Sequence, residues 1–190
     1  KGGTVLKSAR SNEFRTPEGR EKAAKNLRDQ GIEGLIAIGG DGTLAGAAVF
    51  YNEHKIPVVG CPGTIDNDLF GTDETIGFDT ALNTAIENID KIRDTADAHD
   101  RLFLVEVMGR DAGFIALHSG IGGGAEVVMI PETLTDLEDA KTSIHALMSR
   151  QHRSSIIVIA EGDEIGGATD IAKMMRADVR FDDIDLRVCI

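Results

Sequence analysis

Tryptophan is absent from this 190-residue sequence, and tyrosine, cysteine and proline are scarce, with one, two and four residues. Cys61 and Cys189 belong to no Cys-x-x-Cys pattern, which favours a reducing, cytosolic setting. No apolar run approaches the roughly 18 residues of a membrane span, and the first residues show no signal-peptide pattern. The sequence therefore predicts a cytoplasmic protein that does not insert into a membrane.

Basic residues are outnumbered, with 20 Lys and Arg against 32 Asp and Glu and a formal net charge of −12. Such a surface repels nucleic acid and anionic membranes over most of its area, so neither is an expected partner. Anionic small molecules stay possible, because a few arginines and backbone N–H groups can form a local positive pocket. The five histidines lack the spacing of zinc ligands.

Short apolar runs alternate with helical segments along the whole chain. The expected strands cover residues 35–38, 56–59, 102–107, 126–130 and 155–160, and a further apolar run covers residues 186–190. This order predicts an α/β fold of parallel sheets with helices on both faces, in which ligands bind beyond the carboxyl ends of strands. The last run has no following element, so we expect a piece of a longer protein.

Three helices have recognisable start signals. Thr16 precedes Pro17 as a cap before a proline in the first turn, and Thr135-x-x-Glu138 has the spacing of a capping box. The clearest helix begins after Gly77 and is the expected boundary between two lobes. Its apolar residues fall on one face at helical spacing: Phe78, Ala81, Leu82, Ala85, Ile86, Ile89 and Ile92.

The motif Gly39-Gly40-Asp41-Gly42-Thr43 follows the first of these strands and precedes an alanine-rich helical segment. Bare glycine backbones let a phosphate approach, and the next helix offers unpaired N–H groups. Asp41 can then hold Mg²⁺, because a cation shared with phosphates needs only one or two protein carboxylates. A tight turn in which Asp41 caps the helix is the alternative interpretation.

A second motif, Pro62-Gly63-Thr64-Ile65-Asp66-Asn67-Asp68, follows the next strand. In a phosphoryl-transfer site Asp66 would take the proton from an attacking hydroxyl, and Thr64 would contact the phosphate in flight. The alternative is an Asx-turn loop, in which Asp and Asn side chains bond their own backbone.

With residues 75–81 and Val107-Met108-Gly109-Arg110, these motifs resemble the ATP-dependent 6-phosphofructokinase family, nearly from end to end. The resemblance implies two doubly wound, Rossmann-like lobes of three-layer αβα architecture. Residues 1–77 would be part of the ATP-binding lobe, without its N-terminal strand and loop, and residues 78–190 the sugar-phosphate-binding lobe. It also implies a homotetramer that binds ATP and fructose 6-phosphate, with Mg²⁺ as cofactor. With both ends of the site missing, we expect these 190 residues alone to be inactive.

The resemblance also assigns site residues. Asp66 would be the general base on the 1-hydroxyl of fructose 6-phosphate, assisted by Thr64 and Arg110. The ATP phosphates would be lined by Arg10, Ser11, Gly40, Asp41, Gly42 and Thr43, with Asp41 on Mg²⁺. The sugar phosphate would be surrounded by Thr64, Ile65, Asp66, Asp68, Arg101, Met108, Gly109, Arg110 and Glu161, with Arg101 reaching into a neighbouring subunit. An allosteric nucleotide site would include Arg93, Gly124, Ala125 and Glu126, which points to regulation by ADP or phosphoenolpyruvate.

Several alternatives stay open at this point. The pyrophosphate-dependent branch of the family typically has Asp at position 42 and Lys at position 63, and glycine at both favours ATP. Lipid and NAD kinases share the Gly-Gly-Asp-Gly-Thr motif but lack the loop around Asp66. A non-catalytic regulatory subunit would keep the fold, although both Asp41 and Asp66 are present here. Met108 could equally be a core residue.

Overall fold

The computed structural model describes residues 5, 7–99, 101–133, 136–149 and 155–190. The chain forms two compact units, unit 1 (Lys1–Gly63) and unit 2 (Thr64–Ile190). The sequence placed a lobe boundary at 77/78, whereas these units divide at 63/64. The segment before the long helix lies near the rest of unit 2, since the charges of Arg110 and Glu161 act on Asp66. Which ligand each unit binds remains a prediction.

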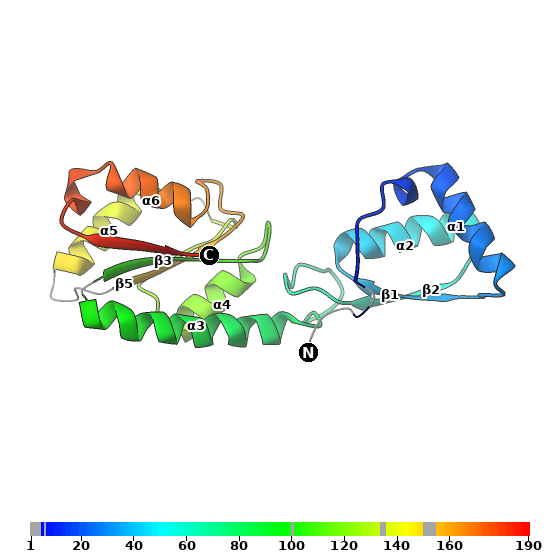
Figure 1. The fold of residues 1–190 in the computed structure, drawn as a ribbon, viewed down its shortest axis with the longest axis horizontal. Coiled ribbons are helices and arrows are strands. Elements are labelled where there is room, and N and C mark those ends of the chain that lie inside the picture. Colours follow the sequence, from blue (N-terminus) through cyan, green and yellow to red (C-terminus); the bar gives the residue numbers. More distant parts are fainter. Residues whose placement is uncertain (1–4, 6, 100, 134–135, 150–154) are drawn as a thin grey trace. The chain divides into compact units, whose positions relative to one another are not determined.

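Unit 1 is a two-stranded parallel sheet with its helices on one face (Figure 1). Its elements are η1 (Glu13–Arg15), α1 (Pro17–Asp29), β1 (Leu35–Gly39), α2 (Asp41–His54) and β2 (Val58–Pro62). The cap signal is confirmed, because Thr16 Oγ1 accepts from the Gly19 N–H at 3.1 Å and Pro17 opens α1. Ala24, Phe50 and Ile56 form the small core.

Unit 2 is a four-stranded, all-parallel sheet in the order β4-β5-β3-β6. Its strands are β3 (Arg101–Val107), β4 (Val127–Met129), β5 (Ser155–Ala160) and β6 (Asp185–Cys189). Its helices are α3 (Phe78–His99), α4 (Phe114–Gly122), α5 (Leu137–Ser149) and α6 (Ala168–Arg176), with the short η2 (Val179–Phe181).

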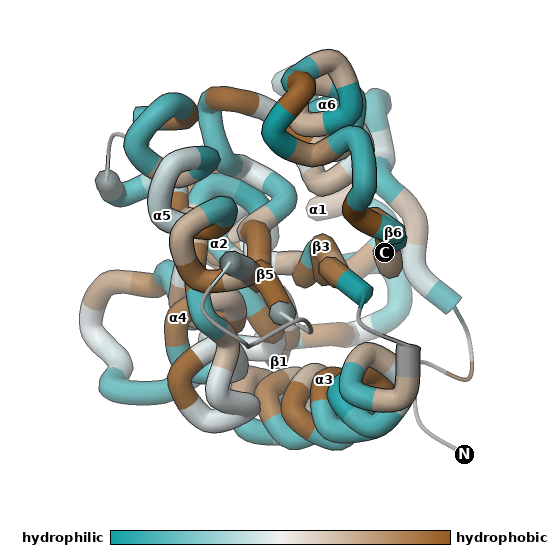
Figure 2. Tube along the Cα trace, turned by 90° about the vertical axis from the view of Figure 1, so that its left-hand side faces the viewer, coloured by the Kyte–Doolittle hydropathy of each residue, from teal (hydrophilic) through white to brown (hydrophobic). Residues whose placement is uncertain are grey.

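Successive strand residues of unit 2 pack into two separate cores. Leu102, Leu104, Ile157 and Ile159 pack with α5 and α6, whereas Phe103, Val105, Ile156 and Val158 pack with α3 and α4. This alternation follows from the two-residue period of a strand, and it makes every residue of β5 buried. Figure 1 shows the two helix layers on opposite sides of the sheet, and Figure 2 shows the apolar character of β5. The predicted three-layer αβα architecture is confirmed in unit 2.

The predicted face of the long helix is also confirmed. Phe78 and Ile89 are buried, and the other five predicted positions are half-buried. At the start of α5, Thr135 of the expected capping box lies outside the described residues. Among the described residues, Asp136 caps this helix, since its Oδ1 accepts from the N–H groups of Glu138 (2.9 Å) and Asp139 (3.1 Å). Of the helices described, none is long and apolar enough to cross a membrane.

Candidate active site

The glycine turn of unit 1 joins β1 to α2. The N-cap residue is Gly40, whose carbonyl accepts from the N–H groups of Thr43 (3.0 Å) and Leu44 (3.1 Å). The tight strand–helix turn of the alternative interpretation is present, but Asp41 is the first residue of the helix and Gly40 takes the cap position. Its carboxylate is exposed and has no hydrogen-bond or ion-pair partner among the described residues. An unpaired carboxylate beside a helix N-terminus fits a cation shared with a phosphate.

The two glycines that bear on the phosphoryl donor differ in the space around them. A Cβ on Gly42 would meet nothing within 4 Å, so the space beside this backbone is open. A Cβ on Gly63 would lie 2.7 Å from Ile38 Cγ2 and 3.2 Å from the Gly39 nitrogen. A lysine at position 63 therefore requires the Ile38 side chain to move, whereas an aspartate at position 42 would occupy empty space beside the turn.

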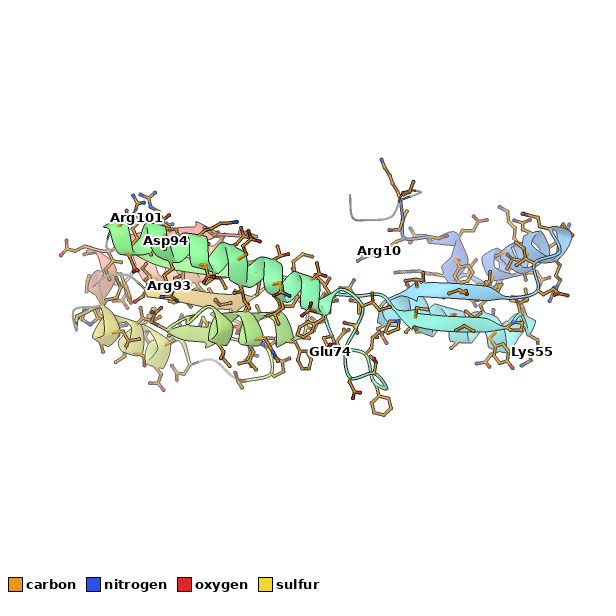
Figure 3. All side chains as sticks on the ribbon, turned by 90° about the horizontal axis from the view of Figure 1, so that it is seen from below. Arg10, Lys55, Glu74, Arg93, Asp94 and Arg101 are labelled. Carbon is orange, nitrogen blue, oxygen red and sulfur yellow. The ribbon has the colours of Figure 1, made fainter. Side chains whose placement is uncertain are left out.

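The structure gives Arg10 and Ser11 different environments. Arg10 is exposed (Figure 3), and Ser11 Oγ accepts from the Phe14 N–H at 3.2 Å at the start of η1. No hydrogen bond or ion pair among the described residues joins either one to the glycine turn. Their predicted contacts with ATP remain predictions.

In unit 2, the loop after β2 is held by two side chains. Thr64 Oγ1 accepts from the Asp66 N–H at 3.2 Å, and Asn67 Oδ1 accepts from the Thr75 N–H at 2.9 Å. Asn67 also adopts a left-handed backbone with φ of 56°, which asparagine tolerates better than most residues. The Asn67 side chain thus bonds a backbone group eight residues further along the chain, whereas the Asx-turn alternative expected bonds to the adjacent backbone. Among the described residues, no backbone N–H donates to the Asp66 carboxylate.

Asp66 is half-buried among charged neighbours from other segments of unit 2. Burial raises the pKa of the Asp66 carboxyl, and the negative charges of Asp68 and Glu161 raise it further. The Thr64 hydrogen bond and the positive charge of Arg110 lower this pKa in part. A carboxylate with a raised pKa is a stronger base than an exposed aspartate, which is the property that proton abstraction needs.

The turn after β3 presents Met108, Gly109 and Arg110. Glu161, directly after β5, accepts from the N–H groups of Gly109 (3.2 Å) and Arg110 (2.7 Å) through Oε1. Arg110 has a φ of 53°, a left-handed conformation that these bonds help to hold. Met108 is 62% exposed, so the alternative of a core role is wrong. The structure thus brings five predicted residues of unit 2 together: Thr64, Asp66, Asp68, Arg110 and Glu161.

Arg101 lies elsewhere in unit 2. It is the first residue of β3, whereas Met108 follows the last residue of that strand. Its Nε donates to Asp185 Oδ2 at 2.7 Å. Figure 3 shows it at the other end of unit 2 from the loop that carries Glu74. The structure therefore does not bring Arg101 to Asp66 within one chain, and its predicted role in a neighbouring subunit's site stays a prediction.

The four residues of the predicted allosteric site do come together. Arg93 donates through Nη2 to the carbonyl oxygens of Gly123 (2.7 Å) and Gly124 (2.6 Å), and its Nη1 lies 3.6 Å from Glu126 Oε1. The other Glu126 oxygen accepts from the Ile156 N–H at 2.6 Å. Ala125 lies between Gly124 and Glu126. Arg93 thus ties α3 to the turn before β4, and an effector would have to compete with these contacts.

A sequence model of the family described as Phosphofructokinase matches residues 1–190. The chain belongs to the phosphofructokinase family. It is 58% identical over 173 residues to the ATP-dependent 6-phosphofructokinase of Cytophaga hutchinsonii, covering 91% of this chain and 53% of that protein. It is 57% identical over 176 residues to ATP-dependent 6-phosphofructokinase 1 of Thermus thermophilus, covering 93% and 55%. The chain spans about half the length of the curated relatives it matches.

Solved phosphofructokinase structures agree with this assignment. The phosphofructokinase of Saccharomyces cerevisiae matches with a TM-score of 0.86 and 36% identity, covering 99% of this chain and 29% of that one. A pyrophosphate-dependent phosphofructokinase from Marinobacter aquaeolei, at 24% identity and a TM-score of 0.78, shares the fold. The α/β fold with parallel sheets, predicted from the sequence, is thereby confirmed.

Two carboxylates at the carboxyl edge of this phosphofructokinase sheet were not predicted. Glu106 Oε2, from β3, accepts from the Ala168 N–H at 2.7 Å, and Glu132 Oε1 accepts from the Gly113 N–H at 2.7 Å. Each bonds the N-terminus of a helix that lacks a side-chain cap of its own. The sequence signal for Glu106 was its charge in an otherwise apolar strand, whereas Glu132 lies in a loop and gave no signal.

Proposed function

We propose that the protein containing this chain transfers the γ-phosphoryl group of ATP to the 1-hydroxyl of fructose 6-phosphate, giving fructose 1,6-bisphosphate and ADP. The observation that carries the proposal is the half-buried Asp66 carboxylate, with its raised pKa, beside Thr64, Arg110 and Glu161. The names of two relatives that are 58% and 57% identical over the matched residues support the same reaction.

In this proposal unit 2 binds and activates the sugar phosphate. Asp66 takes the proton from the 1-hydroxyl of the sugar while the hydroxyl oxygen attacks the γ-phosphorus of ATP. The bond between the γ-phosphorus and the ADP oxygen then breaks. Thr64 donates to the moving phosphoryl group, and the Arg110 guanidinium offsets the charge that develops on it. Ile65, Asp68, Met108, Gly109 and Glu161 would line the sugar. The exposed Met108 side chain and the bonds of Glu161 to the Arg110 turn are compatible with these roles.

Unit 1 would hold the nucleotide. Gly40, Gly42 and Thr43 would line the ATP phosphates with Arg10 and Ser11, and Asp41 would hold Mg²⁺, which neutralises charge on the phosphate oxygens when bound. The donor set fits this metal, because the unpaired Asp41 carboxylate is a hard oxygen ligand at a helix N-terminus. The open space at Gly42 supports ATP over pyrophosphate as the donor, since it leaves room for an α-phosphate.

Steady-state kinetics of the full-length protein test the proposal. The protein is assayed with fructose 6-phosphate and either MgATP or magnesium pyrophosphate, and the sugar product is identified by phosphorus NMR. We expect fructose 1,6-bisphosphate from ATP and at least about a hundredfold lower kcat/KM with pyrophosphate, as for a site built for one donor. A preference for pyrophosphate would overturn the donor assignment. Absence of turnover with both donors would favour a non-catalytic regulatory subunit.

The setting and assembly of the protein belong to the same proposal. We propose a cytoplasmic homotetramer in which Arg101 binds the 6-phosphate in a neighbouring subunit, after release from Asp185. Effector nucleotides would bind at Arg93, Gly124, Ala125 and Glu126. Sedimentation of the full-length protein measures the number of subunits, and titration with ADP and phosphoenolpyruvate measures the regulation.

A further inference from the structure

Glu106 is a charged residue that follows the apolar middle of β3. β3 has the sequence Arg-Leu-Phe-Leu-Val-Glu-Val, and the residues from Leu102 to Val105 are buried. Strand alternation places Glu106 on the same face as Leu102 and Leu104, toward α5 and α6. A carboxylate here loses hydration, which costs free energy unless hydrogen bonds replace the water. Its place in the strand therefore calls for a specific partner.

That partner is the N-terminus of α6. Glu106 Oε2 accepts from the N–H of Ala168, the first residue of the helix, at 2.7 Å. Ala168 is fully buried, so its N–H has no access to water. The N-cap residue, Gly167, provides no side-chain bond. Glu106 thus performs the capping role from a neighbouring strand, and the positive end of the helix dipole favours its negative charge.

The loop between β5 and α6 connects this contact to the candidate active site. It begins at Glu161, whose carboxylate bonds the N–H groups of Gly109 and Arg110, and it ends at Gly167. Consecutive turns stiffen it: the Asp163 N–H donates to the Ala160 carbonyl (3.2 Å), and the Gly166 N–H donates to the Asp163 carbonyl (3.0 Å). At position 162, a Cβ would overlap the Arg110 carbonyl oxygen, so loop and turn lie in direct contact.

The two carboxylates therefore form reciprocal ties. Glu106, on β3, holds the end of the β5–α6 loop, and Glu161, at the start of that loop, holds the turn after β3. We propose that Glu106 is a positioning residue for sugar-phosphate binding: through the bond to Ala168 it fixes the β5–α6 loop, and through Glu161 it sets the backbone of Arg110. The effect on sugar-phosphate binding rests on the proposed function. The coupling between the β5–α6 loop and the turn after β3 does not.

Gly167 offers a way to disturb the Glu106 carboxylate without removing it. Its φ of −73° is open to any residue, so an added methyl group causes no backbone strain. The Cβ would overlap Glu106 Oε2, and the three atoms nearest to it all belong to the Glu106 carboxyl group. Gly167→Ala should therefore displace the carboxylate, and its effect should disappear once Glu106 is shortened to alanine.

Amide hydrogen exchange of the full-length protein tests the coupling without any reference to activity. Glu106→Ala is expected to speed exchange at residues 109–110 as well as at residues 166–168. Glu106→Gln keeps an oxygen acceptor of the same length and should stay close to wild type. Glu87→Ala, which removes an exposed acid of α3 paired with Lys91, is the matched control and should leave both segments unchanged. Faster exchange confined to residues 166–168 would refute the coupling.

Kinetics test the consequence for binding. We expect Glu106→Ala and Gly167→Ala each to raise KM for fructose 6-phosphate about tenfold with KM for ATP unchanged, since sub-ångström misplacement costs less than the about hundredfold for 1 Å. The double variant should be no worse than Glu106→Ala alone. If Glu106→Ala does not fold, Glu106→Asp withdraws the carboxylate by one methylene and gives the same comparison. Unchanged KM in the folded variants, or additive effects, would overturn the proposal. A wild-type protein without this kinase activity would refute the proposed function instead, and the exchange data would still decide on the coupling.

Discussion

Replacement of Asp66 by Asn is the most direct test of the proposed chemistry. The variant keeps the size of the side chain and removes its ability to take a proton. The loop should keep its shape, because its ties run from Thr64 Oγ1 to the Asp66 N–H and from Asn67 Oδ1 to the Thr75 N–H. The variant therefore tests the loss of the basic group without a change in the loop backbone.

The expected loss in kcat follows from general-base catalysis, which contributes about 10²–10⁴-fold. Asp68 stays close enough to influence the pKa of Asp66, but it is exposed and lies two residues further along the loop. We expect it to substitute poorly, so kcat should fall about a thousandfold, or about 4 kcal/mol in the barrier. KM for ATP should stay close to wild type, because the predicted nucleotide residues belong to unit 1.

Asp66→Asn should lower kcat but raise the stability of the folded protein. Burial raises the pKa of Asp66 above that of an unfolded chain, so the folded state disfavours the ionised form. This penalty is present above the folded pKa and is relieved as the pH falls below it. Asp66→Asn should therefore raise Tm at pH 7, with the gain over wild type shrinking in acid. A variant that loses activity and gains stability separates a catalytic role from misfolding.

The assay couples formation of fructose 1,6-bisphosphate to NADH oxidation in the full-length protein, across a range of pH. In the wild type, the midpoint of the acid limb of the kcat/KM profile should lie at a higher pH than the ordinary aspartate pKa of about 3.9. Asp68→Asn, the control, should move that limb to lower pH, because the Asp68 charge raises the pKa of Asp66. Asp66→Asn activity at a tenth of wild type or more would remove this residue from the role of base.

Three further predictions concern other parts of the chain. Gly42→Asp fills the open space beside the glycine turn, and its charge should repel the phosphates of ATP. We expect KM for ATP to rise at least about tenfold and KM for fructose 6-phosphate to stay unchanged. A KM for ATP equal to that of wild type would refute the assignment of this space. Thr16→Ala removes the cap of α1 and should destabilise unit 1 by about 1 kcal/mol in urea unfolding, while Thr16→Ser should not. Arg180 lowers the pKa of Asp178 well below its ordinary value, so Asp178→Asn should lower Tm at pH 7, and the difference should vanish as wild-type Asp178 is protonated in strong acid; a difference independent of pH would exclude this cause.

The sequence by itself predicted the order of the elements and selected the residues proposed for the site. Periodicity predicted the buried face of α3 because a helix repeats every 3.6 residues, and the order of apolar runs predicted parallel strands. Thr16 and Pro17 marked the start of α1 through local chemistry alone. The motifs selected Asp41, Asp66 and Arg110 because phosphoryl transfer requires a metal ligand, a base and a cation. Local signals were sufficient wherever the cause was local.

The tertiary structure decided which of these residues act on one another. Burial is the largest cause of the raised pKa of Asp66, and burial is a property of the folded chain. Arg110 and Glu161 are distant from Asp66 in sequence, and their charges act on this pKa in opposite directions. Glu106 and Ala168 are 62 residues apart, and no local pattern predicts a helix cap supplied from another strand. The exact helix starts also came from the structure, where Asp136 caps α5 and Gly40 is the N-cap residue of α2. Burial, strand register and long-range hydrogen bonds are properties of the folded chain. They decide which residues of separate motifs lie close enough to act on one another.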